Sequence, residues 1–364
     1  MKNQNRKIPK IRFNRFNSVW EEDRIADIVK ISAGGDVDKV KLKESGKYPV
    51  IANALTNKGI VGFYDDYKVK APAVTVTGRG DVGYAVARHE NFTPIVRLLT
   101  LQSEKIDVDY LENQINSMRI LNESTGVPQL TAPQLGNYKV YHPKIEEQSA
   151  IGTLFRTLDD LLSSYKDNLA NYQSLKATML SKMFPKTGQT VPEIRLNGFE
   201  EDWERKSLSE VCTINSGRDY KHLKNGDIPV YGTGGYMLSV NEKLSDEDAI
   251  GIGRKGTIDK PYLLSAPFWT VDTLFYVICK VGYDLNYLFL IFQKIRWKKF
   301  DESTGVPSLS KKTIEKVVSK FPSYEEQCAI GLYFSDLDNL INYYQEKISQ
   351  LETLKKKLLQ DMFI

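Results

Sequence analysis

The strongest constraint on the fold of this chain is an internal duplication. The segment Pro9–Glu21, PKIRFNRFNSVWE, recurs as Pro192–Glu204, PEIRLNGFEEDWE, and both copies fit P-x-I-R-x-N-x-F-x-x-x-W-E. A second block, Glu123–Pro128 (ESTGVP), recurs as Glu302–Pro307, and from there to Phe184 and Phe363 about 24 of 62 positions are identical without a gap. Self-similarity on this scale predicts two copies of one domain rather than a single larger fold.

The similarity between the two copies is uneven. Residues 37–122 and 220–301 match only loosely, for example Tyr48-Pro49-Val50 with Ile228-Pro229-Val230 and Gly78-Arg79 with Gly253-Arg254. These segments are either loops that have drifted or surfaces selected to recognise different things, and the sequence leaves both interpretations open. In either case the pattern predicts one scaffold that carries two unlike surfaces.

Each copy ends in a segment with the periodicity of a long helix. Apolar residues recur at alternating spacings of three and four over about four heptads, which is the seam of a coiled coil. Pro143 and Pro322 precede these segments and Pro185 follows the first, as expected at helix ends. We expect the helices to pack through Ile151, Leu154, Leu158, Leu161, Tyr165, Tyr172 and Leu175 in the first copy and Ile330, Leu337, Leu340, Tyr344, Leu351, Leu354 and Leu358 in the second.

The remaining segments have the pattern of mixed α+β domains. Short β-like runs, such as Ala73–Thr77 and Ala249–Ile252, are separated by glycine-rich turns. The predicted organisation is a globular domain at 1–142, a long helix at 143–184, a linker at 185–190, a second globular domain at 191–321 and a second long helix at 322–364.

Composition narrows the class of protein. The chain has 364 residues, 41% hydrophobic and 26% charged, as in ordinary globular domains. No apolar run has membrane-spanning length, and the basic start lacks the apolar stretch of a signal peptide. Cys212, Cys279 and Cys328 are scattered and odd in number, which favours a reducing, cytoplasmic location. The net charge of +4 permits a nucleic-acid partner without requiring one.

Cations on tight turns are the candidate nucleic-acid contacts. Glycine lets the backbone bring a cation close to a phosphate or a base edge, although an ordinary hairpin with a solvated arginine has the same pattern. In Arg296–Phe300 (RWKKF) aromatic residues are interleaved with cations. The aromatic rings either stack on bases beside phosphate contacts or, if the segment is a helix, pack in the core while the cations are solvated. The candidate DNA-binding residues are Lys58, Arg79, Arg88, Arg218, Lys221, Arg254, Lys255, Arg296 and Lys298.

Motifs of common enzymes are missing from the sequence. Gly251–Gly256 is followed by Thr257 and not by the lysine of a phosphate-binding loop. There is no Asn/Asp-Pro-Pro-aromatic segment, as used by amino-methyltransferases, and no Gly-x-Ser-x-Gly. His89, His142 and His222 show no metal-ligand spacing. We therefore expect no catalytic residue, no metal site and no cofactor in this chain.

Four elements, in the same order in both copies, resemble the specificity (S) subunit of type I restriction–modification systems. They are the P-x-I-R-x-N-x-F…W-E start, the Gly-Arg turns, Ser-Thr-Gly-Val-Pro-x-Leu at 124–130 and 303–309, and Pro-x-x-Glu-Glu-Gln-x-Ala-Ile-Gly at 143–152 and 322–331. The resemblance implies an α+β protein with two target-recognition domains in tandem duplication. Two long antiparallel coiled-coil helices, related by pseudo-two-fold symmetry, would separate these domains.

The resemblance also implies partners. Each domain would read half of a bipartite site on double-stranded DNA, and because the two variable segments differ, the target would be asymmetric. Two modification (M) subunits would bind S-adenosylmethionine and methylate adenine, and restriction (R) subunits would use ATP and Mg²⁺, so that this chain itself is not an enzyme. Candidate contacts with the modification subunits are Glu146, Glu147, Gln148, Glu325, Glu326 and Gln327. The glutamates and glutamines could instead stabilise the helix starts.

Two other classes of protein fit parts of the sequence. One is a coiled-coil adaptor whose globular domains bind protein and have no DNA specificity; salt-dependent DNA binding would distinguish the two classes. The other is a nuclease or methyltransferase fused to recognition domains, for which the chain offers no spare length.

Overall fold

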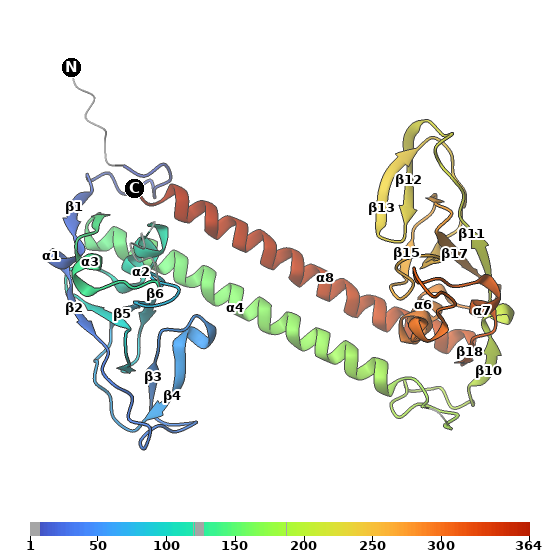
Figure 1. The fold of residues 1–364 in the computed structure, drawn as a ribbon, viewed down its shortest axis with the longest axis horizontal. Coiled ribbons are helices and arrows are strands. Elements are labelled where there is room, and N and C mark those ends of the chain that lie inside the picture. Colours follow the sequence, from blue (N-terminus) through green and yellow to red (C-terminus); the bar gives the residue numbers. More distant parts are fainter. Residues whose placement is uncertain (1–7, 119, 121–126, 187) are drawn as a thin grey trace. The chain divides into compact units, whose positions relative to one another are not determined.

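The computed structural model describes residues 8–118, 120, 127–186 and 188–364, and the chain divides into two compact units. Unit 1 comprises residues 1–167 and 346–364, and unit 2 comprises residues 168–345. Each unit thus contains one globular domain, the first part of the long helix that follows it and the last part of the other long helix (Figure 1). The globular domains and the long helices are therefore built into the same cores.

Unit 1 contains three small sheets. An antiparallel sheet has the order β2 (Lys30–Ala33), β8 (Leu99–Gln102), β5 (Ala73–Val76), β6 (Ala85–Arg88). A second has the order β4 (Ile60–Tyr64), β3 (Tyr48–Ile51), β7 (Thr93–Pro94), and β1 (Glu21–Arg24) pairs with β9 (Lys139–His142). Helices α1 (Ile25–Ile28), α2 (Val108–Ser117) and α3 (Ala132–Gly136) and the 3-10 turn η1 (Thr56–Gly59) complete the domain.

Unit 2 repeats this topology. Its four-stranded sheet has the order β11 (Cys212–Ser216), β17 (Leu274–Cys279), β14 (Ala249–Gly253), β15 (Tyr262–Leu264). The three-stranded sheet is β13 (Gly235–Val240), β12 (Asn225–Gly232), β16 (Trp269–Thr270), and β10 (Glu204–Ser207) pairs with β18 (Val318–Phe321). Helices α5 (Leu208–Val211), α6 (Leu285–Lys294) and α7 (Lys311–Glu315) occupy the places of α1, α2 and α3, whereas the 3-10 turn η2 (Trp297–Phe300) follows α6 and does not correspond to η1. The predicted duplication of a mixed α+β domain is confirmed.

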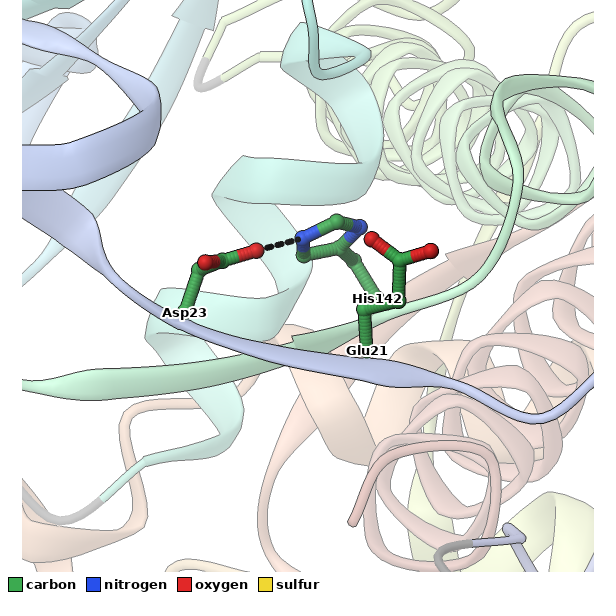
Figure 2. Close-up of side chains that lie close together, drawn as sticks. All are labelled: Glu21, Asp23 and His142. Carbon is green, nitrogen blue, oxygen red and sulfur yellow. Dashed lines mark hydrogen bonds and ion pairs between the residues drawn. The ribbon is translucent and has the colours of Figure 1, made fainter.

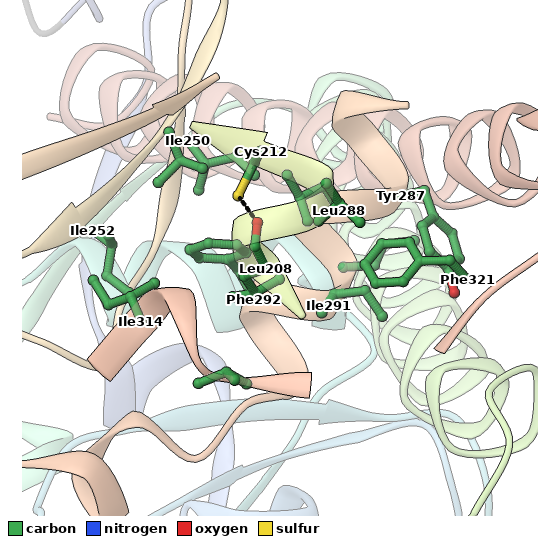
Figure 3. Packing of buried hydrophobic residues seen from close by; sticks show 14 of the residues in the cluster. Leu208, Cys212, Ile250, Ile252, Tyr287, Leu288, Ile291, Phe292, Ile314 and Phe321 are labelled. Carbon is green, nitrogen blue, oxygen red and sulfur yellow. Dashed lines mark hydrogen bonds between the residues drawn. The ribbon is translucent and has the colours of Figure 1, made fainter. Parts of the chain in front are cut away.

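The core of each unit is organised around a buried tyrosine. In unit 2, Tyr287 on α6 packs edge-to-face on Trp203, with ring centroids 5.9 Å apart, and its hydroxyl donates to the Lys320 carbonyl at 2.7 Å. Figure 3 shows this region with the apolar face of α6 packed among residues of the sheet and of α5. In unit 1, Trp20 and Tyr110 repeat the arrangement at 6.1 Å. The repeated W-E motif therefore supplies a core residue.

The predicted long helices are confirmed as α4 (Ile145–Lys182) and α8 (Tyr324–Asp361). In unit 1 their segments run antiparallel: Lys166 pairs with Glu352 at 2.7 Å, and Phe155 meets Phe363 with centroids 5.7 Å apart. In unit 2 the segments are again antiparallel, since Lys176 pairs with Asp338 at 2.5 Å and further along Tyr172 stacks on Tyr344.

The predicted helix seam is partly wrong. Leu161, Leu340 and Leu354 are exposed, whereas four residues outside the prediction, Phe155, Leu162, Phe334 and Ile348, are buried. Ile151, Leu158, Ile330 and Leu337 are buried as expected; Leu154, Tyr165, Tyr172, Leu175, Tyr344, Leu351 and Leu358 are half-buried. The reason is that each helix packs on its globular domain as well as on the other helix, and this needs an apolar stripe wider than a coiled-coil seam.

The three cysteines are free, but two of them are neighbours. Cys212 on β11 lies directly opposite Cys279 on β17, a proximity that sequence spacing did not indicate. Burial raises the pKa of both thiols to about 12, so they stay protonated at neutral pH. Among the helices of the described residues, none combines the length and the apolar character that crossing a membrane requires.

Candidate nucleic-acid interface

A buried ion pair joins the start of each copy to its long helix. Arg12 donates to both carboxylate oxygens of Glu147, at 2.7 and 2.6 Å, and Arg195 donates to those of Glu326 at 2.8 and 2.7 Å. These hydrogen bonds raise the pKa of both guanidinium groups. The arginine of the P-x-I-R motif and the second glutamate of the Glu-Glu-Gln motif are therefore partners in a bidentate pair.

The glutamines of the same motif link the start of each long helix to the start of α2 or α6. Gln148 donates to the Pro143 carbonyl at 2.8 Å and accepts from the Asp107 N–H at 2.9 Å. Gln327 makes the same two contacts with Pro322 and Asp284, at 3.0 and 3.2 Å. Asp107 and Asp284 in turn cap α2 and α6. These contacts fix each globular domain against the first turns of a long helix.

This burial corrects part of the prediction about partner contacts. The side chains of Glu147, Gln148, Glu326 and Gln327 are at most 2% exposed, so they cannot form a contact surface for a modification subunit. Their polar atoms are used inside the fold, because a buried carboxylate or amide without partners is costly. Glu146 and Glu325 are exposed and stay predictions.

The last residue of the motif, a glycine, is needed where α2 and α6 approach the long helices. A Cβ atom at Gly152 would lie 2.6 Å from the Asp107 Oδ1 atom, and one at Gly331 would lie still closer to Asp284 Oδ1. The repeated motif thus places a glycine, which has no side chain, next to the aspartate that caps α2 or α6.

In unit 1 the turn Gly78-Arg79-Gly80 forms a small exposed platform. The Gly80 N–H donates to the Pro128 carbonyl at 3.1 Å, and the Leu130 N–H donates to the Gly78 carbonyl at 2.9 Å. Asn53 accepts from the Gly78 N–H at 2.7 Å, and Arg97 donates to Gln129 at 2.9 Å. The Arg79 side chain is exposed on this platform. Residues 124–126 of the Ser-Thr-Gly-Val-Pro motif lie outside the described residues.

Unit 2 has the same platform, with a corrected alignment. The Gly256 N–H donates to Pro307 at 2.8 Å and the Leu309 N–H donates to Arg254 at 2.9 Å. Arg79 therefore corresponds to Lys255, and the alignment of Gly78-Arg79 with Gly253-Arg254 is wrong by one residue. Arg254 and Lys255 are exposed beside a groove of about 500 Å³, whose lining also includes Phe275, Glu302 and Lys311.

The hairpin next to the platform differs between the units. Strands β3 and β4 are joined by residues 52–59, in which Asn57 and Lys58 adopt left-handed backbone conformations with φ of 49° and 48°. Arg88, only 8% exposed, donates to the Lys58 carbonyl at 2.7 Å and to Thr75 at 3.0 Å. Strands β12 and β13 are joined instead by the short turn Thr233-Gly234. The structure thus gives Arg88 a role in holding the Lys58 turn, and Lys58 itself is exposed.

The remaining candidate cations have mixed environments. Arg218 and Lys221 are exposed, and the backbone of Arg218 is held by the Trp269 indole at 2.9 Å. Lys298 pairs with Asp259 at 2.8 Å, whereas Arg296 is exposed. Trp297 is 1% exposed and donates to the Phe292 carbonyl, so this aromatic residue serves the core and cannot stack on a base.

One polar cluster was not indicated by the sequence. Figure 2 shows His142 on β9 between the carboxylates of Glu21 and Asp23 on β1, with its Nε2 atom 2.9 Å from Asp23. One ligand atom from each of the three residues lies within 4.8 Å of the others, as a metal site would require. The second copy has Glu204, Lys206 and Phe321 at these places, with Lys206 paired to Glu204 at 2.8 Å. The cluster is therefore not part of the shared scaffold.

Comparison with known proteins agrees with this architecture. The family described as the type I restriction modification DNA specificity domain matches residues 17–171 and again 200–353. The MjaVIII specificity subunit of a type I restriction enzyme of Methanocaldococcus jannaschii is 23% identical, covering 93% of this chain and 91% of its own length. The crystal structure of the S subunit of a type I restriction–modification system from M. genitalium covers 98% of this chain and 99% of its own, with 19% identity and a TM-score of 0.76, and so shares its fold. Because the family matches most of the chain, in two copies, the protein belongs to the DNA specificity family of type I restriction–modification systems.

Proposed function

We propose that this chain is the sequence-reading, non-catalytic subunit of a type I restriction–modification complex and that its two units read the two unlike halves of a bipartite site on double-stranded DNA. S-adenosylmethionine, ATP and Mg²⁺ would bind to two modification subunits and to the restriction subunits. The observation that carries this proposal is the pair of equivalent platforms at Arg79 and Lys255, each presenting an exposed cation beside a hairpin that differs between the units.

The chemistry of the platforms suits DNA in two ways. Exposed cations supply phosphate contacts, which give affinity without sequence preference. Arg79, Arg97 and Gln129 form a group of donors and acceptors in unit 1. Such groups can read base edges in the major groove.

The asymmetry of the target follows from the differences between the platforms. Two identical readers would select a palindromic site. Here Gln129 corresponds to Ser308, Arg79 to Lys255, and an eight-residue connection to the short turn at Thr233-Gly234. We therefore expect two half-sites with different sequences.

The long helices are the elements we propose to set the distance between the half-sites. Each has 38 residues, or roughly 57 Å at 1.5 Å per residue, and each continues from one unit into the other. Deleting seven residues from the central part of both helices should shorten the permitted gap. A shortened protein that still methylates sites with the original gap, together with its modification subunits, would contradict this role.

The modification subunits are proposed to contact exposed residues on the long helices. Glu146 and Glu325 are exposed in the first helical turns, and Leu332 on α8 is 62% exposed, so these surfaces are accessible to a partner. Glu325→Gln should weaken co-purification of a modification subunit while changing the unfolding free energy by no more than about 1 kcal/mol. An adaptor without DNA specificity would bind partners but show no steep loss of DNA affinity with salt.

A further inference from the structure

Unit 2 contains a pocket of about 550 Å³ that has no part in the proposed DNA-reading platform. Its lining residues come from the linker after α4, from strands β10 and β18, and from the end of α6. Its walls combine apolar side chains, including Ile291, Ile295 and Val318, with the four cations Lys186, Arg205, Lys294 and Lys320. Among the described residues that line it, none is acidic.

Two of these cations face each other across a strand pair. Arg205 on β10 lies directly opposite Lys320 on β18. Like charges at directly opposite positions destabilise an antiparallel pair. In the described part of the chain no carboxylate forms an ion pair with Arg205 or Lys320. The second copy therefore places two like charges opposite each other, and Lys320 donates to the Lys186 carbonyl at 3.5 Å.

The first copy shows that the scaffold does not need this cation pair. The equivalent residues on β1 and β9 are Glu22 and Tyr141, which also face each other. Glu22 pairs with Lys139 at 2.7 Å, so the local charge there is balanced. Among the described residues, the facing cation pair is thus present at this strand pair of unit 2 and not at its counterpart in unit 1.

The other two cations are held at the pocket by their surroundings. Lys294 donates to the Leu180 carbonyl at 2.6 Å and lies 4.6 Å from the centroid of the Phe184 ring. Lys186 pairs with Glu193 at 3.1 Å and its carbonyl lies 3.5 Å from the Lys320 Nζ atom. These contacts fix the Lys294 side chain at the lining of a partly apolar cavity, whereas the charge of Lys186 is already paired with Glu193.

We propose that this pocket binds a phosphate group, carried either by a free nucleotide or by the backbone of a nucleic acid. A guanidinium group matches phosphate oxygens through paired N–H donors, and neighbouring ammonium groups balance the second negative charge. The apolar wall offers a surface for the attached nucleoside, and the volume lies in the range of small-molecule sites. Bound phosphate would also remove the repulsion between Arg205 and Lys320. The proposal does not depend on sequence-specific DNA recognition.

The test compares two double variants of the full chain. Arg205→Gln with Lys320→Gln removes the facing pair, and Lys299→Gln with Lys316→Gln removes the same charge from exposed positions of unit 2 outside the pocket. Calorimetry measures binding of inorganic phosphate, of AMP and of a short duplex of arbitrary sequence, with chloride keeping the ionic strength constant. The pocket variant should bind phosphate or AMP at least about tenfold more weakly than the control.

The three ligands distinguish the source of the phosphate. Saturable binding of phosphate or AMP that only the pocket variant loses supports a free ligand, with tighter AMP binding indicating use of the apolar wall. A loss confined to the duplex supports a backbone phosphate. In chloride alone the pocket variant should unfold at the same temperature as the wild type or above it, which shows that the fold is intact; Lys320→Gln alone serves if the double variant is unstable. Equal binding of all three ligands by the pocket and control variants would overturn the proposal.

Discussion

The buried pair Arg195–Glu326 gives the sharpest test of how the duplicated motifs hold the protein together. The side chain of Glu326 is 1% exposed and that of Arg195 is 15% exposed. Arg195→Met leaves the carboxylate buried without its cation, and removing one partner of such a pair typically costs about 3–5 kcal/mol. Replacing both residues, as in Arg195→Met with Glu326→Leu, removes the stranded charge as well and should cost much less.

Urea unfolding followed by tryptophan fluorescence measures these free energies, and hydrogen exchange of the α6 amides shows whether unit 2 is the part affected. Glu204→Gln, which breaks the exposed pair with Lys206, is the control and should cost less than about 1 kcal/mol. Arg12→Met should reproduce the effect in unit 1, because Arg12 and Glu147 have the same geometry. The reasoning is refuted if Arg195→Met stays within about 1 kcal/mol of the wild type or if the double replacement is as harmful as the single one.

Three further changes have defined outcomes. Gly331→Ala should destabilise unit 2 by about 1–3 kcal/mol in urea unfolding, because its Cβ would collide with the Asp284 carboxylate; an unchanged midpoint would contradict the need for glycine. Burial raises the pKa of Glu112 from 4.5 to about 7, so the native state holds this proton more tightly than the unfolded state and stability should fall as the pH rises from 4.5 to about 7. Glu112→Gln should remove up to about 3 kcal/mol of this pH dependence, and equal profiles would refute it. Lys255→Gln should reduce the salt dependence of DNA binding by roughly one phosphate contact. Lys298 is already paired with Asp259, so Lys298→Gln should change this dependence less. Equal salt dependence in the two variants would argue against the platform.

The features that were predictable from sequence are those repeated in sequence. The duplication and the two long helices follow from motifs that recur with fixed spacing, and the glycine turns from glycines that recur at slightly shifted positions. The helix seam was harder, because Leu161 and Leu162 are adjacent and either could continue the apolar pattern. In the structure Leu162 is buried and Leu161 is exposed, which the spacing alone does not decide.

Side-chain partners remote in sequence could not be predicted. Arg12 and Glu147 are 135 residues apart, and nothing in their spacing pairs them, although both belong to repeated motifs and this was a usable signal. Cys212 and Cys279, and His142 with Asp23, are brought together by strand pairing, which the sequence did not reveal. The correspondence of Arg79 with Lys255 rests on backbone hydrogen bonds, because the segments between the repeated motifs differ in length.

The most direct test of the central proposal is a map of adenine methylation in cells that produce modification subunits with and without this chain. We expect methylation that depends on the chain, at a single motif made of two unlike half-sites with a fixed gap. Exchanging residues 37–122 for the corresponding segment of another specificity subunit should change one half-site only. Methylation that is independent of the chain, or a motif that is palindromic or continuous, would contradict the proposal that the two units read different halves of one DNA target.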